Sequence, residues 1–540
     1  MDSKLTRLIA VASSSVLVLT ILAAAPAAVR AGTTAYIGDG TGSGECDTPD
    51  YLTNGSADDV VFNDAVDGEY GDIDNILYVC PGTYDIEDHI YVPGDLTIES
   101  VAGAAATVLD SDGTSRILDL NGDSIIRGLT FKDGNAGGGD GGAIYSDSYE
   151  LTVEDSIFVN NQGSDGGAIS ADGCLDLVLD STFTNNHADD DGGAIYVDDD
   201  IFDDNEDGES GLIGNTFSGN TADDDGGAVF VDYDLEASSV ISGNTFSNNV
   251  ADENTDDSGD GGAVWVSDDT NGTLTSNTFS DNSAVYGGAV WVGDDIEELI
   301  GGNTFSGNTA NEDGGALYTN EDFDGALSDN IFSGNSAGGN GGAVFVFDAI
   351  TDTFSGNTFS GNTAGGNGGG IFQYGDDGGA LSGTISGNRF VSNTATEDGG
   401  GLHLRNLSGD GVITRNQFRT NTAGGNGGGA WLDDTGEAGS ELAIVSGNMF
   451  RSNRAEGSGG GMYIYWTNTS VAPSKMTRNS FRSNRAGDIG GGIAIMGLND
   501  CVPELTTRQA ARAFKKNKYA SNRASGSRRS MNVGADPCVD

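Results

Sequence analysis

The chain has 540 residues, and its 83 acidic and 24 basic residues give a formal net charge of -59 at pH 7. It contains 87 Gly but only 7 Pro, without a Gly-X-Y period, which excludes collagen, and so acidic a chain is not expected to bind nucleic acid. Disorder is not expected either, because 36% of the residues are hydrophobic and recur in register. One long stacked-repeat fold is favoured over several separate domains.

The charge is unevenly distributed along the sequence. No Lys or Arg lies between Lys132 and Arg389. Residues 389–540 contain 18 basic and 13 acidic residues, a net charge of +5, whereas the rest of the chain contains 6 basic and 70 acidic residues, a net charge of -64. We therefore expect a long acidic surface suited to cations or high salt, followed by a weakly basic end.

Residues 1–31 have the features of a signal peptide. Lys4 and Arg7 precede an apolar run that ends at Ala28, and small residues follow at a plausible cleavage site next to Ala31. Because this run approaches the length of a membrane span, an uncleaved signal anchor is the alternative. No later stretch is long and apolar enough to span a bilayer. We expect a secreted or cell-surface, extracellular protein with no transmembrane segment after the signal peptide.

Residues 32–130 are predicted to form an N-terminal cap and the first irregular coils of the repeat fold. They lack the repeat motifs described below, but they contain strand-like runs that begin at Ile76, Ile90 and Ser124.

The five cysteines fit an exported protein with few disulfides. Cys46 with Cys80 and Cys501 with Cys538 would each close a loop near one end of the chain, which leaves Cys174 as an expected small buried side chain. No Cys/His grouping indicates a zinc site.

Two short motifs alternate through residues 131–500. One is Phe-x-x-Asn, and the other is Gly-Gly followed by Ala or Gly and an aliphatic residue, as in GGALY from Gly314. Successive Phe residues are 25 to 34 residues apart. The Phe residues of the first motif are Phe158, Phe183, Phe217, Phe246, Phe279, Phe305, Phe332, Phe359, Phe390, Phe418, Phe450 and Phe481, with looser copies at Phe131 and Tyr519.

A unit of this length cannot bury an apolar face alone, so the units must stack. The segments are short, β-branched or aromatic, and bounded by Gly, Asn and Asp, which favours strands over helices. We predict an all-β fold, a parallel β-helix of about 14 coils with two or three strands per coil. Phe fills the interior, Asn forms a ladder from coil to coil, and the Gly pair permits a tight corner. Residues 501–540 are predicted to form a basic C-terminal cap with a possible disulfide, because a solenoid needs covered ends.

The combination of GGA plus an aliphatic residue with FxxN resembles the repeats of the polymorphic outer membrane protein family, over about residues 131 to 522. The segment ILYVCPGTY followed by LTIESV also looks like the entry to pectin-lyase-like β-helices. These resemblances imply a right-handed parallel β-helix in an exported bacterial surface protein with an adhesin-like role.

Strand parity singles out a row of aromatic residues. In GGAVFV, Val229 and Val231 share one face and Phe230 lies on the other. If the aliphatic face points to the core, the other face carries an exposed aromatic stripe, suited to stacking on sugar rings or to gripping a protein partner. The alternative is that the rings only stack on one another, or point inward, and stabilise the solenoid. The predicted binding residues are Tyr196, Phe230, Trp265, Trp291, Tyr318, Phe345, Phe372 and Trp431.

Acidic loops make calcium a possible cofactor, because hard cations prefer several carboxylate oxygens. The calcium-binding β-roll repeat is not matched, however, and a solvated acidic face is the alternative. The candidate ligands are Asp189, Asp190, Asp191, Asp223, Asp224 and Asp225.

The resemblance to pectin-lyase-like proteins leaves catalysis as an alternative, since paired carboxylates can act as acid and base on glycosides. Asp pairs are too frequent here to single one out, and His403 lies in the aromatic row, so no catalytic residue is assigned. The favoured function is a non-catalytic, adhesin-like binding rod for a cell-surface or polysaccharide ligand. The alternative is a carbohydrate-active enzyme on extracellular polysaccharide.

Overall fold

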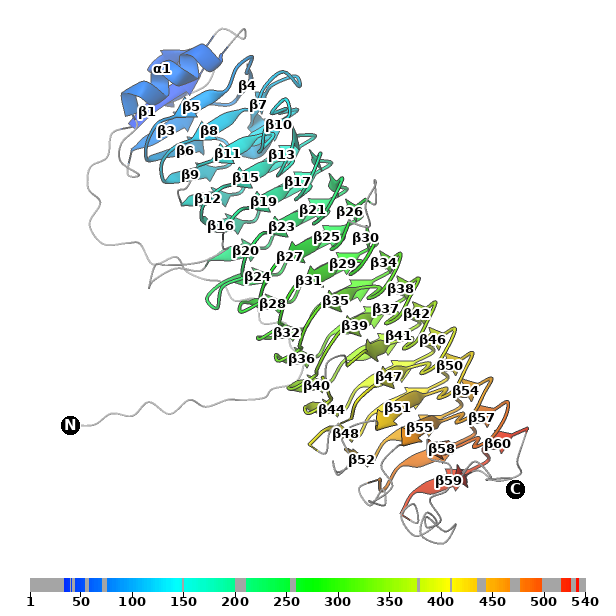
Figure 1. The fold of residues 1–540 in the computed structure, drawn as a ribbon. Coiled ribbons are helices and arrows are strands. Elements are labelled where there is room, and N and C mark those ends of the chain that lie inside the picture. Colours follow the sequence, from blue (N-terminus) through cyan, green and yellow to red (C-terminus); the bar gives the residue numbers. More distant parts are fainter. Residues whose placement is uncertain are drawn as a thin grey trace, which may run out of the picture.

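The structure, a computed structural model, is a straight rod in which the chain winds repeatedly around one axis (Figure 1). It describes residues 34–38, 40, 44–53, 58–69, 75–147, 150–199, 210–252, 259–375, 379–407, 410–434, 443–466, 476–497, 516–525 and 531–533. The predicted signal peptide and the predicted pair Cys501 and Cys538 lie outside these residues.

Four sheets run along the rod, three with 16 strands and one with 13. Neighbouring strands in each sheet come from successive coils and pair in parallel, as Phe305 with Phe332. The predicted all-β parallel solenoid is confirmed, with about 13 complete turns among the described residues in place of about 14. Sheet A runs from β2 (Tyr51–Leu52) to β52 (Ile444–Ser446), sheet B from β4 (Gly82–Asp85) to β59 (Lys518–Ala520), sheet C from β5 (Ile90–Val92) to β61 (Met531–Val533), and sheet D from β14 (Gln162–Gly163) to β60 (Arg523–Ala524).

A typical coil contributes one strand to each sheet. One such coil consists of β33 (Thr304–Ser306), β34 (Thr309–Ala310), β35 (Leu317–Thr319) and β36 (Leu327–Ser328), in sheets B, D, C and A. The prediction of two or three strands per coil missed sheet D, because a two-residue strand is too short to show an alternating pattern. Ala310 is only 2% exposed, so a small side chain fits where β34 faces the core.

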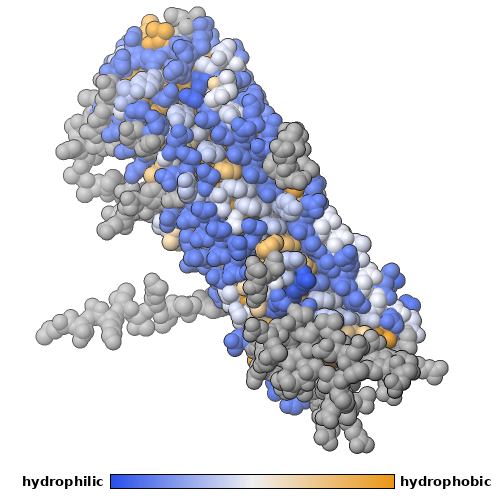
Figure 2. All heavy atoms as spheres, in the orientation of Figure 1, coloured by the Kyte–Doolittle hydropathy of each residue, from blue (hydrophilic) through white to orange (hydrophobic). Residues whose placement is uncertain are grey.

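The core of the rod contains a continuous stack of phenylalanine rings, whereas the described residues on the face seen in Figure 2 are mostly hydrophilic. The rings of Phe305 and Phe332 are fully buried, with centroids 4.7 Å apart and planes within 2° of parallel. Because the strands of sheet B pair these positions directly, each coil adds one ring to the stack. This confirms the interior role predicted for the Phe of the FxxN motif.

Two ladders of buried asparagine join the coils. The predicted ladder uses the Asn of FxxN. Asn308 Oδ1 accepts hydrogen bonds from the backbone N–H and the Nδ2 of Asn282, and Asn308 Nδ2 donates to Asn335 Oδ1. A second, unpredicted ladder uses the Asn that precedes the strands of sheet B from β21 (Thr216–Ser218) onward, where Asn303 donates to Asn330 Oδ1 in the same way. Both ladders satisfy buried backbone groups at corners where no strand partner is available.

The Gly-Gly corners give a direct test of coil stacking. A Cβ on Gly315, the second Gly of its pair, would lie 2.4 Å from the carbonyl oxygen of Gly342 in the next coil. Gly315→Ala is therefore expected to destabilise the rod by about 2–4 kcal/mol, since backbone and not a flexible side chain must move.

The matched control for Gly315→Ala is Gly334→Asn. Gly334 has φ +69°, nothing would lie within 4 Å of its Cβ, and Asn248 takes the equivalent position at φ 55°. Thermal unfolding should show a large decrease in melting temperature for Gly315→Ala and little change for Gly334→Asn. Equal melting temperatures would contradict the close packing of the corners.

The N-terminal end of the rod is covered by helix α1 (Asp59–Glu69), as Figure 1 shows. Phe62, Ala65 and Val66 lie on one face of the helix and are at most 1% exposed, and the ring of Phe62 meets that of Tyr84 edge-on at 5.3 Å. A cap is predicted here from the sequence, but no helix. The sequence does carry a signal for this helix, because Phe62, Ala65 and Val66 have the i, i+3 and i+4 spacing of an amphipathic helix.

The predicted disulfide between Cys46 and Cys80 is confirmed, with Cα atoms 5.7 Å apart. It joins the segment before α1 to the end of β3 (Ile76–Val79), so it fixes the cap to the first coil. Cys174 was expected to be buried, but the structure shows that its side chain is half-buried.

The described part of residues 501–540 continues the solenoid. Strands β59 (Lys518–Ala520), β60 (Arg523–Ala524) and β61 (Met531–Val533) extend sheets B, D and C by one more coil, so this part of the predicted cap repeats the coil pattern. Within the described ranges, no helix is long and apolar enough to cross a membrane.

Candidate functional site

The predicted aromatic row lies on the outer face of sheet C. Val229 and Val231 are fully buried in the core, and Phe230 between them points the other way. The ring of Phe230 stacks on that of Trp265 with centroids 4.2 Å apart, and Trp265 stacks on Trp291 at 4.8 Å. The strand parity on which the prediction rested is therefore correct.

The row is less exposed than predicted. Four members are buried, with Phe230 5%, Tyr318 7%, Phe345 3% and Phe372 2% exposed, and the other four are half-buried. The cause is stacking, because each ring covers the faces of its neighbours, and Tyr286, Phe347 and Tyr374 also pack against the central rings. The planes of Trp265 and Trp291 lie within 2° of parallel. A ligand therefore meets ring edges, and the expected stacking of sugars on ring faces is not available within the row.

A second row is formed by the residue that precedes each Gly-Gly pair, and we call it the corner row. Asp191 Oδ1 accepts a hydrogen bond from the N–H of Asp225 at 2.8 Å, and Asp225 Oδ1 accepts one from the N–H of Asp260 at 2.7 Å. Each carboxylate thus holds the corner of the next coil. Polar members of the row with such a contact are Asp140, Asp165, Asp191, Asp225, Asp260, Asp313, Asn340, Asn367, Asp398 and Asn426.

Burial raises the pKa of six corner-row carboxyls, those of Asp165, Asp191, Asp225, Asp260, Asp313 and Asp398. The pKa of Asp165 is raised to about 6, and those of Asp191 and Asp260 to about 7. Neighbouring carboxylates add to the effect of burial, and the hydrogen bonds from backbone N–H groups only partly offset it. A fraction of these groups is therefore protonated near neutral pH, and the rod carries less negative charge than its composition suggests.

The six predicted calcium ligands do not form one ligand group. Asp189 and Asp190 accept hydrogen bonds from Gln162 and Ser164 of the preceding coil, whereas Asp191 belongs to the corner row. Asp225 is also in the corner row, while Asp223 and Asp224 occupy the same coil before it. Among the described residues, only one group of three carboxylates brings its oxygens within 4.8 Å of one another, and it lies elsewhere.

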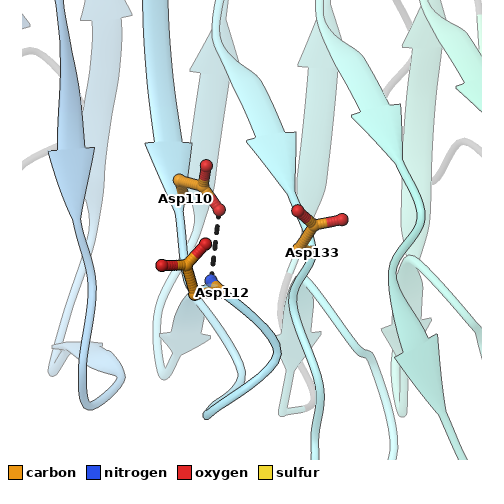
Figure 3. Close-up of side chains that lie close together, drawn as sticks. All are labelled: Asp110, Asp112 and Asp133. Atoms are coloured by element: carbon orange, nitrogen blue, oxygen red, sulfur yellow. Dashed lines mark hydrogen bonds between the residues drawn. The ribbon is translucent and has the colours of Figure 1, made fainter.

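That group consists of Asp110, Asp112 and Asp133 (Figure 3). Lys132 Nζ lies 2.6 Å from Asp110 and 2.7 Å from Asp133, so a cation of the chain itself already neutralises the cluster. Burial alone would raise the pKa of Asp133, but hydrogen bonds from Lys132 and Asn160 outweigh it and lower this pKa. The neighbouring pocket of about 310 Å³, lined by Asp112, Asp133 and Asn160 among others, is polar and open. The cluster is best explained as a stabilising ion-pair network.

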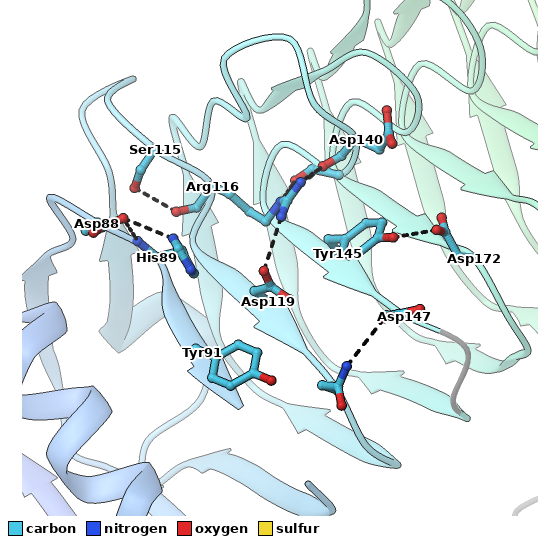
Figure 4. A network of polar contacts seen from close by, with 12 residues as sticks. Asp88, His89, Tyr91, Ser115, Arg116, Asp119, Asp140, Tyr145, Asp147 and Asp172 are labelled. Carbon is cyan, nitrogen blue, oxygen red and sulfur yellow. Dashed lines mark hydrogen bonds and ion pairs between the residues drawn. The ribbon is translucent and has the colours of Figure 1, made fainter. Parts of the chain in front are cut away.

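A larger polar network covers the outer face of sheet C on the first coils (Figure 4). Arg116 lies 4.7 Å above the ring of Tyr145, its Nη1 is 3.5 Å from Asp119, and its Nη2 donates to the carbonyl oxygen of Asp140 at 2.6 Å. Tyr145 donates its hydroxyl to Asp172, and burial together with this carboxylate raises the Tyr145 pKa.

His89 and Tyr91 lie on the adjacent coil of this network (Figure 4). His89 contacts Asp88 at 3.0 Å, and Tyr91 is 45% exposed. The network therefore places a histidine, a guanidinium, two phenols and several carboxylates together on one face.

Neither the corner row nor the polar network around Arg116 is predicted from the sequence. The corner row has a simple signal, an Asp or Asn directly before most Gly-Gly pairs, which was read as part of variable acidic loops. The network around Arg116 leaves a weaker signal in the sequence. Tyr145 holds the aromatic position after a Gly-Gly pair, in GGAIY from Gly141, but its contacts with Arg116 and Asp172 require knowledge of which residues stack on neighbouring coils.

Parts of the chain match two known families. Residues 250–436 match the model described as periplasmic copper-binding protein (NosD), and residues 180–198 and 216–232 match the Chlamydia polymorphic membrane protein repeat. No curated protein matches the chain. Among solved structures, the PL6 family polysaccharide lyase from Pseudopedobacter saltans is 11% identical over 88% of this chain and 92% of that chain, with a TM-score of 0.23. Two segments of this parallel β-solenoid thus match the polymorphic membrane protein repeat that its FxxN and GGA motifs resemble.

Proposed function

We propose that the chain is a secreted or cell-surface, non-catalytic binding rod with an adhesin-like role toward a cell-surface or polysaccharide ligand. The supporting observation is the aromatic row on sheet C, in which Tyr196, Trp265, Trp291 and Trp431 keep part of their surface exposed. A row that repeats once per coil offers many similar contacts along one extended ligand, and many weak contacts together give useful avidity. The predicted signal peptide supports export.

The test is binding by the chain without residues 1–31 to arrays of glycans and to intact cells. Replacing both Trp265 and Trp291 with Ala should weaken binding at least about tenfold, because a few aromatic anchors supply most of the binding energy in such contacts and these two rings keep part of their surface open to a ligand. Phe345→Ala is the matched control, since Phe345 stacks in the same row but is only 3% exposed. The control should lower the melting temperature without loss of binding. Undiminished binding by the double variant would contradict the proposed role of the row.

Copper binding, named in one matched family description, does not fit the matched residues. Residues 250–436 contain no Cys or Met and a single histidine, His403. Its ring lies between those of Phe372 and Trp431 at 4.9 and 4.1 Å, and burial lowers its pKa to about 3. A copper site needs several soft or imidazole ligands, which this stretch does not supply.

The polar network of Figure 4 favours an enzyme on extracellular polysaccharide as the second candidate. It combines a cationic Arg116 with groups that can carry protons, such as Tyr145 and His89. In the present arrangement Arg116 is bound by carbonyl oxygens and by Asp119, and Tyr145 by Asp172, which suits a structural network better. Incubation with polygalacturonate and neutral glycans should give no new reducing or unsaturated ends. Product formation that Tyr145→Phe abolishes would reverse the order of the two candidates.

A further inference from the structure

Sheet D lies along one edge of the rod, which we call the D edge, and Figure 1 shows its strands from β26 (Val250–Ala251) to β60 in one line. The charge of the D edge changes sign along its length. Acidic residues follow the strands near the N-terminal end, β18 (His187–Ala188), β22 (Thr221–Ala222) and β26, and arginines lie in or next to the last strands, β54 (Arg454–Ala455), β57 (Arg485–Ala486) and β60. The acidic group is Asp189, Asp190, Asp223, Asp224 and Asp252. The basic group is Arg454, Arg485 and Arg523 in the strands of sheet D, together with Arg451 and Arg482 at the ends of the sheet B strands β53 (Met449–Arg451) and β56 (Ser480–Arg482) that precede them. The five arginines outnumber the two acidic residues that follow β54 and β57, Glu456 and Asp488.

The basic group is unfavourable for the isolated rod. Arg454 lies directly opposite Arg485, which lies opposite Arg523, and like charges in such pairs destabilise a sheet. All five arginines are exposed. The ion pair of Arg454 with Glu456, at 3.4 Å, is itself exposed and contributes little. The same positions in earlier coils hold neutral residues such as Ser336. This end of the D edge would therefore gain from an anionic partner.

The two charged groups are placed symmetrically. Sheet D has 13 strands, and β38 (Ser336–Ala337) is the seventh. Strand β18 is second from one end and β57 second from the other, and β22 and β54 are the third strands from their ends. A rotation of 180° about an axis that is perpendicular to the rod and passes just outside β38 therefore places β18 and β22 of one copy against β57 and β54 of another. Because every coil adds the same strand spacing of about 4.8 Å, β18 then lies opposite β57 and β22 opposite β54, which are the two strand pairs that bring opposite charges together.

We propose that two copies of this chain associate antiparallel along the D edge, with the basic group of each copy against the acidic group of the other. Such an interface is isologous, so one twofold axis satisfies both ends at once and the assembly closes as a dimer. Near the axis the corners after β38 and β42 (Thr363–Ala364) begin with Gly338 and Gly365, which lack side chains and permit close approach.

The size of the edge predicts a weak and charge-dependent dimer. Thirteen strands span about 58 Å, and a contact about 10 Å wide buries roughly 600 Å² on each copy, at the low end for specific interfaces. At physiological salt the Debye length is about 8 Å, so the contacts at the edge outweigh the repulsion between the distant acidic surfaces. A linear polyanion would also suit the arginines, but it would leave the matching acidic group without a role, and a second copy explains both.

The first test is sedimentation of the chain without residues 1–31 at about 0.15 M salt. The expected result is a dimer that dissociates in the micromolar range and weakens at high salt. Charge reversal at one end, Arg454→Glu with Arg485→Glu, or at the other, Asp189→Arg with Asp223→Arg, should each weaken self-association at least about tenfold.

A mixture of the two charge-reversed variants should form a heterodimer, because each variant then offers the charge that the other lacks. The matched control, Arg415→Glu with Arg478→Glu, makes the same charge change at the corner before sheet B, away from the D edge, and should dimerise as the unchanged chain does. Melting temperatures close to that of the unchanged chain will show that the variants are folded.

The second test is the position of the axis. A short bismaleimide should join two copies of Ser336→Cys through the new thiols, because Ser336 lies next to the proposed axis, and should not join two copies of Ser218→Cys, which is four coils away. The unchanged chain, with Cys174 present, measures the background. The proposal is overturned if the chain is a monomer across micromolar concentrations, if the mixed variants do not associate, or if Ser336→Cys gives no more product than background. None of these outcomes affects the proposed role of Trp265 and Trp291 in ligand binding.

Discussion

Replacing Asn308 with alanine is expected to reduce the free energy of unfolding by about 3–5 kcal/mol. Asn308 Oδ1 accepts hydrogen bonds from the N–H and Nδ2 of Asn282 at 3.1 and 3.0 Å, and Asn308 Nδ2 donates to the carbonyl oxygen of Phe279 at 3.2 Å. All three contacts are buried, and each polar group left without its partner costs about 1–3 kcal/mol. Thermal unfolding followed by circular dichroism will measure the loss.

Hydrogen exchange will show which coils lose stability in the Asn308→Ala variant. A rod of stacked coils can open locally, so faster exchange is expected in the coils on either side of Asn308 and not at the ends. Asn308→Asp should also destabilise, because it keeps an acceptor but loses the donor to Phe279. Thr309→Ala is the control, since Thr309 is exposed and adjacent in sequence. A loss for Asn308→Ala no greater than that for Thr309→Ala would show that the ladder is not a main source of stability.

The rod is expected to become more stable as the pH falls from 8 to 5. The pKa values of about 6 for Asp165 and about 7 for Asp191 and Asp260 lie above that of an exposed Asp, 3.8, so the folded state binds more protons than the unfolded state. The contribution of these three carboxyls to the free energy of unfolding is fully present below about pH 4, and it is lost as the pH rises through 6 and 7. Each such carboxyl contributes on the order of 1–3 kcal/mol to this difference. Melting temperatures across this range will measure it.

Changing corner-row carboxyls to amides should flatten this pH dependence. Asp191→Asn with Asp260→Asn should raise the melting temperature at pH 8 and change it little at pH 4.5, because Asn340 already fills the same role elsewhere in the row. Asp155→Asn, at an exposed turn, removes one charge outside the row and serves as the control. A double variant with the same slope as the unchanged chain would show that other carboxyls control the pH response.

Most of the fold could be predicted from the sequence because each coil repeats the same chemistry. The recurrence of Phe305 and Phe332 with the neighbouring Asn and Gly residues identified the stack, one Asn ladder and the corners. The second ladder through Asn303 was missed because Asn before a strand also suits an ordinary turn. Helix α1 was missed because it occurs once, outside the repeats, and a single short amphipathic segment is a weak signal.

The candidate site was less predictable. Strand parity correctly placed Phe230 and Trp265 on the outer face, but exposure depends on how closely neighbouring rings stack, and parity does not give this. The acidic run at Asp189 to Asp191 looked like one loop with one role. In the structure Asp191 supports the next corner while Asp189 and Asp190 contact the preceding coil, because the backbone turns within the run.

The two asparagine ladders give the rod an electrical direction. In each ladder the side-chain carbonyl accepts from the preceding coil, as Asn308 does from Asn282, so the amides all point the same way along the axis. Aligned amide dipoles add, as they do along an α-helix. The rod therefore carries a permanent axial dipole in addition to its uneven charge, and it should orient in an applied electric field, with a birefringence signal that decreases when a ladder is interrupted.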